Sequence, residues 1–253
     1  MKLNTRVSPD IEALSRDALE EVLANLQDAV KLRGRFAIAL SGGHTPSKMY
    51  ALWARNEKYR TETPWDRVHV FWGDERFVGP DDPLSNYRMT REALLSHVPI
   101  PAANVHPAPT NLPTPQAAAA AYDAELRKFF GTGAPAFDVT LLGIGPEGHT
   151  ASLFPGSPAL EEKKKWVEAV TVQANPPNRL TFTLPVLNQS RNTYFLAAGE
   201  GKKPILDALR AESDPAHSQY PVARIEPLDG RVIWFLDEPA SKLTPRPIRP
   251  ASI

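Results

Sequence analysis

Cysteine is absent from this chain of 253 residues. Without it there is no disulfide, no thiolate nucleophile and no thiolate zinc site, which fits a reducing compartment. Long hydrophobic runs are absent as well, since no stretch approaches the roughly 18 apolar residues of a membrane span. Residues 1–10 contain no apolar signal-like segment. We therefore expect a cytoplasmic protein.

An excess of either charge is also lacking, because Lys and Arg total 29 and Asp and Glu total 29. A balanced chain has no overall field that attracts nucleic acid or an anionic membrane. Neither is therefore expected as a partner, and any affinity for phosphate has to come from a local site. Glycine is sparse, with 14 residues against 26 prolines. Prolines between the periodic segments, as in 99–115 and 245–250, predict stiff connections.

Helical and strand patterns alternate along the rest of the chain. Apolar spacing and capping residues predict helices from the cap Ser8-Pro9 to Gly34, from Thr45-Pro46 to about Arg55, from Ser85-Asn86 to Leu95, and over 116–130 and 202–211. Short apolar runs predict strands at 36–40, 68–72, 138–142, 180–184, 193–198 and 232–236. The alternation is typical of an α/β fold with a mainly parallel sheet flanked by helices. No repeat or composition break appears, so we expect one domain over 1–253, with flexible ends at 1–7 and 242–253.

Three of these strands run directly into glycine-bearing loops. Leu40 leads into Ser41-Gly42-Gly43, Leu142 into residues 143–148, and Ala198 into Gly199-Glu200-Gly201-Lys202. In a parallel sheet all three loops lie at the carboxyl edge, where α/β proteins bind ligands. Glycine lets backbone N–H groups approach an anion, and a following helix adds a positive dipole. The pattern favours a phosphorylated small molecule.

The loop Gly143-Ile144-Gly145-Pro146-Glu147-Gly148 also matches the glycine fingerprint of dinucleotide-binding proteins, with Glu168 about 20 residues further on. That fingerprint has to open a long helix, which Pro155 and Pro158 forbid. The pattern also lies in the middle of the chain rather than in a leading βαβ unit. Nucleotide binding is therefore not expected.

Several polar residues near the strand ends are candidates for catalysis or binding. His149 follows the second glycine loop, and its type suits proton transfer as well as a structural role. Glu147 could orient this imidazole or shape the loop. Asp74-Glu75-Arg76 could form a solvated turn or part of a site. Arg179 and Lys202 could be phosphate ligands or ordinary surface cations.

Two absences narrow the chemistry further. There is no Gly-x-Ser-x-Gly nucleophile motif, so an acyl-enzyme route lacks an obvious nucleophile. The six histidines, at 44, 69, 97, 106, 149 and 217, show no metal-ligand spacing. We therefore expect no histidine-based metal site, and a general base that activates water directly.

Taken together, the motifs resemble those of the 6-phosphogluconolactonase family. The matching segments occur in family order over nearly the whole chain: residues 40–46 (LSGGHTP), 72–76 (WGDER), 85–87 (SNY), 143–155 (GIGPEGHTASLFP), 179–181 (RLT), 184–188 (LPVLN), 199–202 (GEGK) and 234–237 (WFLD). The resemblance implies the fold that glucosamine-6-phosphate deaminases and ribose-5-phosphate isomerases share. It also implies hydrolysis of 6-phospho-D-glucono-1,5-lactone to 6-phosphogluconate, the second step of the oxidative pentose phosphate pathway, without metal or cofactor.

The resemblance also implies residue roles. The histidine of the family's Gly-His loop, its proposed general base, maps onto His149, and the arginine of its Asp-Glu-Arg motif onto Arg76. Our expected catalytic set is His149, Arg76, Glu147 and Asp74. The expected substrate-binding set is Ser41, Gly42, Gly43, Thr45, Asn86, Gly145, Gly148, Arg179 and Lys202. Glu147 departs from the family pattern, which usually has aspartate there, and the role of His44 stays open.

Two other functions remain possible. A glucosamine-6-phosphate deaminase shares Ser41-Gly42-Gly43 and Asp74-Glu75, but it carries tyrosine in place of Arg76 and a different sequence after its histidine. A non-catalytic sugar-phosphate sensor would keep the pocket but has no need of His149 and Arg76 together. The expected partner is a small phosphorylated sugar lactone, and the protein is expected to be a monomer or a weak homo-oligomer.

Overall fold

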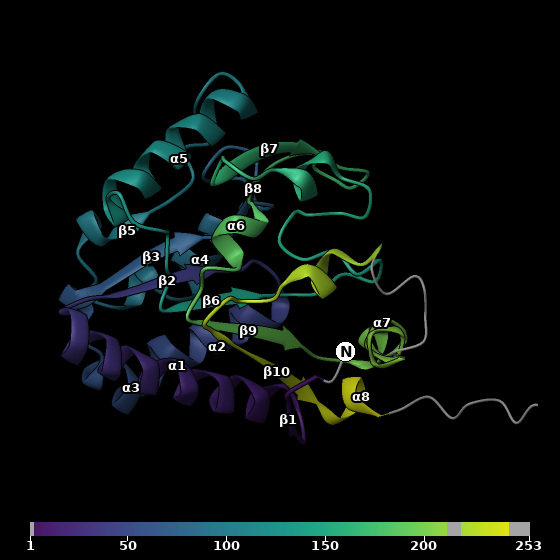
Figure 1. Ribbon diagram of the computed structural model, residues 1–253. Helices are drawn as coiled ribbons and strands as arrows, with labels where there is room; N and C mark the ends of the chain where they lie inside the picture. Colours follow the sequence, from purple (N-terminus) through teal and green to yellow (C-terminus); the bar gives the residue numbers. More distant parts are fainter. Residues whose placement is uncertain (1–2, 212–218, 243–253) are drawn as a thin grey trace, which may run out of the picture.

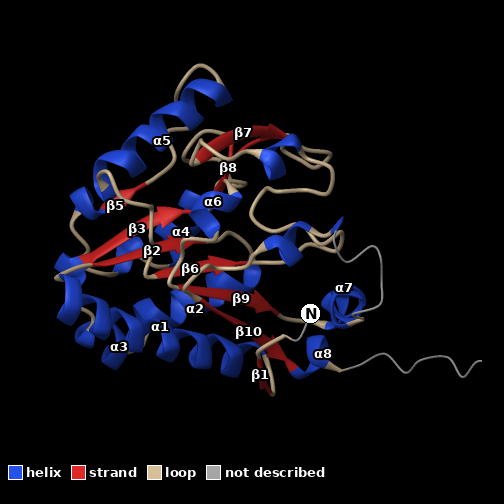
Figure 2. Ribbon diagram, in the orientation of Figure 1, coloured by secondary structure: helices blue, strands red, loops and turns tan. Residues whose placement is uncertain are grey.

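A large parallel sheet organises the chain (Figures 1 and 2). The computed structural model describes residues 3–211 and 219–242. Seven strands stand in the order β1-β10-β9-β6-β2-β3-β5, and all neighbours in it are parallel. Their bounds are β1 Thr5–Ser8, β2 Phe36–Leu40, β3 Val68–Trp72, β5 Val105–His106, β6 Val139–Leu142, β9 Asn192–Ala197 and β10 Arg231–Asp237. The predicted α/β fold with a mainly parallel sheet is confirmed.

Helices and two hydrophobic clusters cover both faces of this sheet. The helices are α1 Ile11–Arg33, α2 His44–Arg55, α3 Glu57–Glu62, α4 Asn86–Ala93, α5 Pro115–Phe130, α6 Leu184–Leu187, α7 Lys203–Arg210 and α8 Glu238–Ser241. Along β2, Phe36, Ile38 and Leu40 join the cluster under α1 and α2, whereas the two intervening alanines face the other cluster. This alternation follows from the two-residue period of a strand. Because both faces of the sheet are buried, every residue of such a strand is apolar, and the sequence shows a continuous apolar run.

A second, smaller sheet covers one face of the large one and was not predicted. It consists of β4 Asp74–Arg76, β8 Asn178–Phe182 and β7 Val167–Thr171, paired antiparallel in the order β4-β8-β7. Figure 1 places β7 and β8 on the same side of the large sheet as α5 and α6. The predicted strand at 180–184 is displaced by two residues, because Leu184 already begins α6.

The ends of the chain differ from expectation where they are described. Residues 1–7 were expected to be flexible, but Thr5–Ser8 pair with β10 as an edge strand. Because Ser8 belongs to this strand, the first helix does not begin at Ser8-Pro9 as predicted. It begins at Ile11 with Asp10 as its N-cap, whose carboxylate accepts a hydrogen bond from the N–H of Ala13. Gly34 ends this helix as predicted, with φ of 73°. Met1, Lys2 and 243–253 lie outside the described residues.

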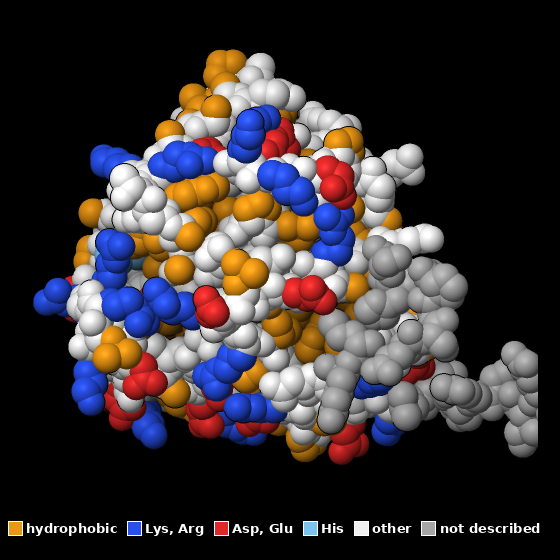
Figure 3. All heavy atoms as spheres, viewed as in Figure 1, with side chains coloured by type: hydrophobic (Ala, Val, Ile, Leu, Met, Phe, Trp, Pro, Cys, Tyr) orange, Lys and Arg blue, Asp and Glu red, His pale blue; other side chains and the backbone are white. Residues whose placement is uncertain are grey.

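The segment 99–115, predicted to be entirely loop, contributes the short edge strand β5, and α3 was also missed. Within the described part of the chain, no helix combines the length and apolarity needed to cross a membrane. Positive and negative side chains are interspersed over the face seen in Figure 3, in keeping with the balanced composition.

Candidate active site

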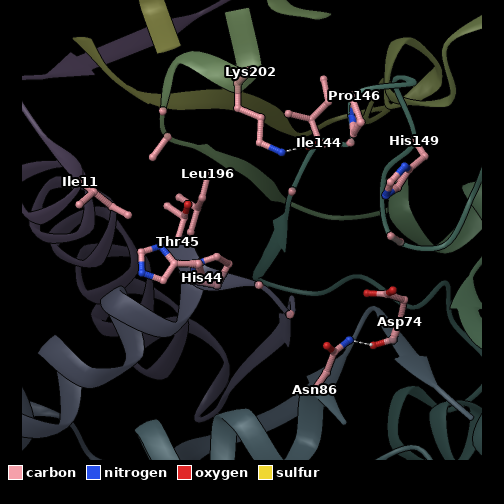
Figure 4. A pocket seen from close by; sticks show the side chains of 18 of the residues that line it. Ile11, His44, Thr45, Asp74, Asn86, Ile144, Pro146, His149, Leu196 and Lys202 are labelled. Atoms are coloured by element: carbon pink, nitrogen blue, oxygen red, sulfur yellow. Dashed lines mark hydrogen bonds between the residues drawn. The ribbon is translucent and has the colours of Figure 1, made fainter. Parts of the chain in front are cut away.

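A cleft of about 650 Å³ opens at the carboxyl edge of the large sheet. It receives the loops after β2, β3, β6 and β9, so the predicted meeting of the three glycine loops is confirmed. Figure 4 shows Lys202, His149, Asp74 and His44 arranged around it, each from a different segment. The cleft is lined by Ile11, Gly42, Gly43, His44, Thr45, Pro46, Asp74, Arg76, Asn86, Gly143, Ile144, Gly145, Pro146, His149, Ala151, Arg179, Leu196, Ala198, Gly199, Lys202 and Asp237.

His149 stands on the wall formed by the loop after β6. Its Nδ1 lies 2.8 Å from Glu147 Oε2, and since a carboxylate only accepts, Nδ1 carries the proton of this bond; in the neutral form of the ring the Nε2 lone pair is then available. The extra methylene of Glu147, relative to the family's usual aspartate, therefore does not prevent this bond. The pKa of Glu147 is lowered: partial burial raises it, but hydrogen bonds from its own backbone N–H and from His149 outweigh this.

Gly145 allows the imidazole to lie against the loop. A Cβ at this position would stand 2.0 Å from Cε1 and 2.1 Å from Nδ1 of His149, closer than any real contact. After Gly148 the chain makes a turn at 150–153 instead of a helix, and the next helical turn is the short 3₁₀ segment Pro158–Glu161. The rejection of a dinucleotide-binding loop is thus supported.

Asp74 begins β4 on the opposite wall of the cleft. Its Oδ2 accepts a 2.7 Å hydrogen bond from the Ser152 hydroxyl, which links β4 to the loop that carries His149. Asn86 donates from Nδ2 to the Asp74 carbonyl, and Gly42 makes room for this amide, since a Cβ there would lie 1.9 Å from Asn86 Oδ1. Ser152, Asn86 and Gly42 thus fix the positions of the polar groups on this wall.

Glu75 is buried behind the wall, and not in a solvated turn. Its carboxylate accepts from the backbone N–H groups of Arg76, Asn86 and Tyr87 and from the Ser85 hydroxyl. Burial raises the pKa of Glu75 to about 7, against the lowering effect of the backbone hydrogen bonds. Its contacts fix β4 to the first turn of α4, which indicates a structural role.

Arg76 and Arg179 are opposed across the β4–β8 pair and both line the cleft. Two like charges in register repel each other. Burial first, and the charge of Arg76 second, lower the pKa of Arg179, while Asp74 and Glu75 act in the opposite direction. Arg76 donates from one terminal nitrogen to the Leu84 carbonyl, but its buried Nε has no hydrogen-bond partner. The pair suits an anion, whose negative charge would relieve the repulsion between the two guanidinium groups.

Lys202 forms a cationic group at the far side of the cleft, on the loop after β9. Its Nζ donates to the Ile144 carbonyl at 2.6 Å, next to the His149 loop. Burial lowers the pKa of Lys202, and the Glu147 carboxylate opposes this effect. The cleft therefore contains positive charge from Lys202 on this loop and from Arg76 and Arg179 on the small sheet.

The structure brings most of the predicted site residues together. Ten of them line the cleft: Gly42, Gly43, Thr45, Asp74, Arg76, Asn86, Gly145, His149, Arg179 and Lys202. Ser41, Glu147 and Gly148 are not among the lining residues. Ser41 is buried and bonded through its backbone to the Tyr50 hydroxyl, Glu147 holds His149 from outside, and Gly148 packs on Tyr220.

Several residues that line the cleft were not predicted to belong to the site, because their residue types alone do not indicate a role there. Ile11 and Leu196 are apolar, and Asp237 ends β10, where its carboxylate accepts from the N–H groups of Gly199 and Ala240. Position at a strand's carboxyl end was the signal available for Asp237. His44, whose role stayed open, lines the cleft at the start of α2. No group of three or more candidate metal ligands occurs among the residues that the structure describes.

Comparisons with known proteins agree with this geometry. The sequence model of a family described as glucosamine-6-phosphate isomerases/6-phosphogluconolactonase matches residues 9–234. A 6-phosphogluconolactonase of Nostoc sp. is 42% identical over 243 residues, which are 95% of this chain and 98% of that protein. The structure of 6-phosphogluconolactonase from Trypanosoma brucei is 30% identical with a TM-score of 0.81, covering 94% of this chain and 97% of that one.

A monomeric glucosamine-6-phosphate deaminase has the same fold. Its TM-score is 0.78 at 19% identity, over 96% of this chain and 100% of that one. At this identity the likeness concerns the fold alone, and it confirms the expectation that the chain shares the fold of glucosamine-6-phosphate deaminases.

Proposed function

Because this chain belongs to the glucosamine-6-phosphate isomerase/6-phosphogluconolactonase family, we propose that it hydrolyses 6-phospho-D-glucono-1,5-lactone to 6-phosphogluconate. One observation carries the proposal: His149 is hydrogen-bonded through Nδ1 to Glu147 and lines a cleft that also contains the cationic side chains of Arg76, Arg179 and Lys202. Hydrolysis of a phosphorylated lactone requires a base with a free lone pair and nearby groups that bind an anion.

In this mechanism neutral His149 removes a proton from water through Nε2 as the water oxygen bonds to C1 of the lactone. The Glu147 carboxylate holds the tautomer and stabilises the imidazolium that forms. When the bond between C1 and the ring oxygen breaks, the imidazolium returns the proton to that oxygen. The products are a carboxylic acid and a hydroxyl group, with no metal or cofactor taking part.

The other polar groups divide between the two ends of the substrate. Arg76, whose guanidinium group lines the cleft, would stabilise negative charge on the C1 carbonyl oxygen. Gly42, Gly43, Arg179 and Lys202 would hold the phosphate, and Asp74 would accept from a sugar hydroxyl. The loop and wall residues Ser41, Thr45, Asn86, Gly145 and Gly148 would shape the binding surface. General acid–base catalysis supplies about 10²–10⁴-fold.

The substitution His149→Asn tests this mechanism directly. We expect kcat for lactone hydrolysis to fall at least about 100-fold after subtraction of the spontaneous reaction. His97→Asn is the matched control, because His97 lies on an exposed turn where its ring contacts the Glu92 carbonyl. Near-normal turnover by the His149 variant would rule out the assigned base.

Two parallel measurements separate the proposal from its alternatives. Ammonia release from glucosamine 6-phosphate would identify a deaminase, and tight binding of 6-phosphogluconate without lactone turnover would identify a sensor. We propose further that the protein is a single catalytic domain that acts in the cytoplasm as a monomer or weak homo-oligomer. Its partner would be the small phosphorylated lactone, with neither nucleic acid nor membrane involved.

A further inference from the structure

The imidazole of His149 has a second contact, which the sequence did not predict. The ring of Phe154 lies against it, with 4.0 Å between the ring centroids and 16° between the planes. Glu147 fixes one edge of the imidazole, and the absence of a Cβ at Gly145 leaves space for Cε1 and Nδ1. The imidazole is thus restrained by a hydrogen bond at one edge and by an aromatic ring over one face.

A turn with an unusual backbone brings Phe154 back over the histidine. Leu153 donates its N–H to the Thr150 carbonyl, and within this turn Ala151 has φ of 47°. Ala151 is the single non-glycine residue with positive φ in the described part of the chain. Non-glycine residues adopt this region only where the surroundings impose it, and such residues concentrate at functional sites.

The surroundings that impose the turn are visible on both of its sides. Ser152, next to Ala151, donates to Asp74 through its hydroxyl and to the Thr181 hydroxyl through its N–H. Pro155 follows Phe154, and a residue before proline is confined to extended conformations. Phe154 also packs against the main hydrophobic cluster. Its ring is therefore held independently of the imidazole that it touches.

From this arrangement we propose that Phe154 is a positioning residue, whose ring holds the His149 imidazole in the orientation needed to transfer protons. The face of an aromatic ring attracts a cation, so the same contact favours the imidazolium formed after water attack. The other acidic and basic groups around the cleft are Glu147, Lys202, Asp74, Asp237, Arg76 and Arg179. This inference rests on the proposed function, since it assigns a role within that reaction.

The substitution Phe154→Leu removes the aromatic face while keeping an apolar side chain of similar volume. We expect kcat to fall about tenfold, because misorientation of a catalytic group is costly, while KM stays within about twofold. Phe154→Tyr keeps the ring, and it should retain kcat within about twofold. Phe130→Leu is the matched control, because Phe130 is likewise partly buried against the same cluster but contacts Phe71, Phe129, Phe137 and Trp166 instead of His149.

Nuclear magnetic resonance provides a readout that does not depend on turnover. An imidazole stacked on a phenyl face has ring protons shifted upfield, and in Phe154→Leu the His149 signals, assigned with His149→Asn, should move downfield. Wild-type kcat in Phe154→Leu, or an equal loss in Phe154→Tyr, would overturn the proposal. If the wild-type protein itself hydrolyses no lactone, the proposed function fails, and the spectra still report whether the stack exists.

Discussion

Two glycines, which have no Cβ, decide where two polar side chains of the cleft can lie. A Cβ on Gly42 would overlap the Asn86 amide, and one on Gly145 would overlap the His149 ring. At Gly145 the need is one of space and not of backbone conformation, because its φ is not positive. The sequence motif marks these glycines as loop residues. What they make room for becomes visible only when distant segments are brought together.

Ala151 is the residue at which stability and local geometry conflict. Its left-handed φ costs an L-residue roughly 1–2 kcal/mol, whereas glycine adopts this region freely. We therefore expect Ala151→Gly to raise the free energy of unfolding by up to about 1 kcal/mol, after the larger entropy of glycine in the unfolded chain is included. Urea unfolding followed by fluorescence measures the change.

Ala120→Gly is the control for that measurement, because Ala120 is exposed in the interior of α5. The same substitution there should lower stability by about 1 kcal/mol. Equal destabilisation at both positions would show that the turn imposes no backbone cost.

Among the elements, the three-residue strand β4 carries most of the chemistry of one wall. Asp74 and Arg76 line the cleft. Between them, Glu75 points into the protein, where its carboxylate accepts hydrogen bonds from backbone N–H groups in the first turn of α4. A carboxylate there also interacts favourably with the positive end of that helix. The alternation of a strand thus separates two groups that act on a ligand from one that holds the element in place.

Glu75 makes this part of the structure sensitive to pH. Its pKa is raised to about 7 from 4.5, so the folded protein binds this proton more tightly than the unfolded chain does. Its contribution to stability is therefore largest below about pH 4.5 and declines as the pH rises to about 7. Glu75→Gln removes this titration, and at pH 5 it should cost about 1–3 kcal/mol because an amide N–H₂ faces backbone donors.

Urea unfolding of wild type and Glu75→Gln at pH 5 and pH 8 tests the sign. The difference between the two proteins should be larger at pH 5 than at pH 8. Glu57→Gln, at an exposed position in the first turn of α3, controls for loss of a carboxylate at a helix start. A difference that grows toward pH 8 would contradict the raised pKa.

The two sheets differ in how far the sequence predicts them. Five parallel strands, β2, β3, β6, β9 and β10, were predicted because burial on both faces makes them apolar runs, whereas the short edge strands β1 and β5 were not. The second sheet was missed because β4 consists of three charged residues, whose types are poor strand formers. The candidate site was predicted largely from glycine loops at strand ends. Phe154 and Asp237 were not, since their contacts depend on a tertiary turn and a neighbouring strand.

At the scale of the whole molecule, the cleft joins the two sheets. Gly42, Gly145 and Lys202 come from loops of the large sheet, whereas Asp74 and Arg179 come from the small one. Because the chain has no net charge, an anion has to be bound by a local group of cations, such as the Lys202, Arg76 and Arg179 of this cleft. A ligand with a phosphate and a carboxylate would therefore bridge the two sheets and relieve the repulsion between Arg76 and Arg179.

Thermal unfolding with 6-phosphogluconate tests this bridging. A ligand at about 100 times its Kd stabilises the folded state by about 2.7 kcal/mol, which for a chain of this size raises Tm by roughly 5–10 °C. His149→Asn should keep this increase, because it removes the base and leaves the cations. Arg179→Met should weaken binding at least about tenfold and so lose about half of the increase or more. Without ligand its Tm should not fall by more than about 2 °C, since the repulsion from Arg76 is removed. Arg16→Met, at an exposed site on α1, is the control. If Arg179→Met kept the full increase, the two-arginine wall would not contact the ligand, and Lys202 and the glycine loops alone would hold its anionic groups.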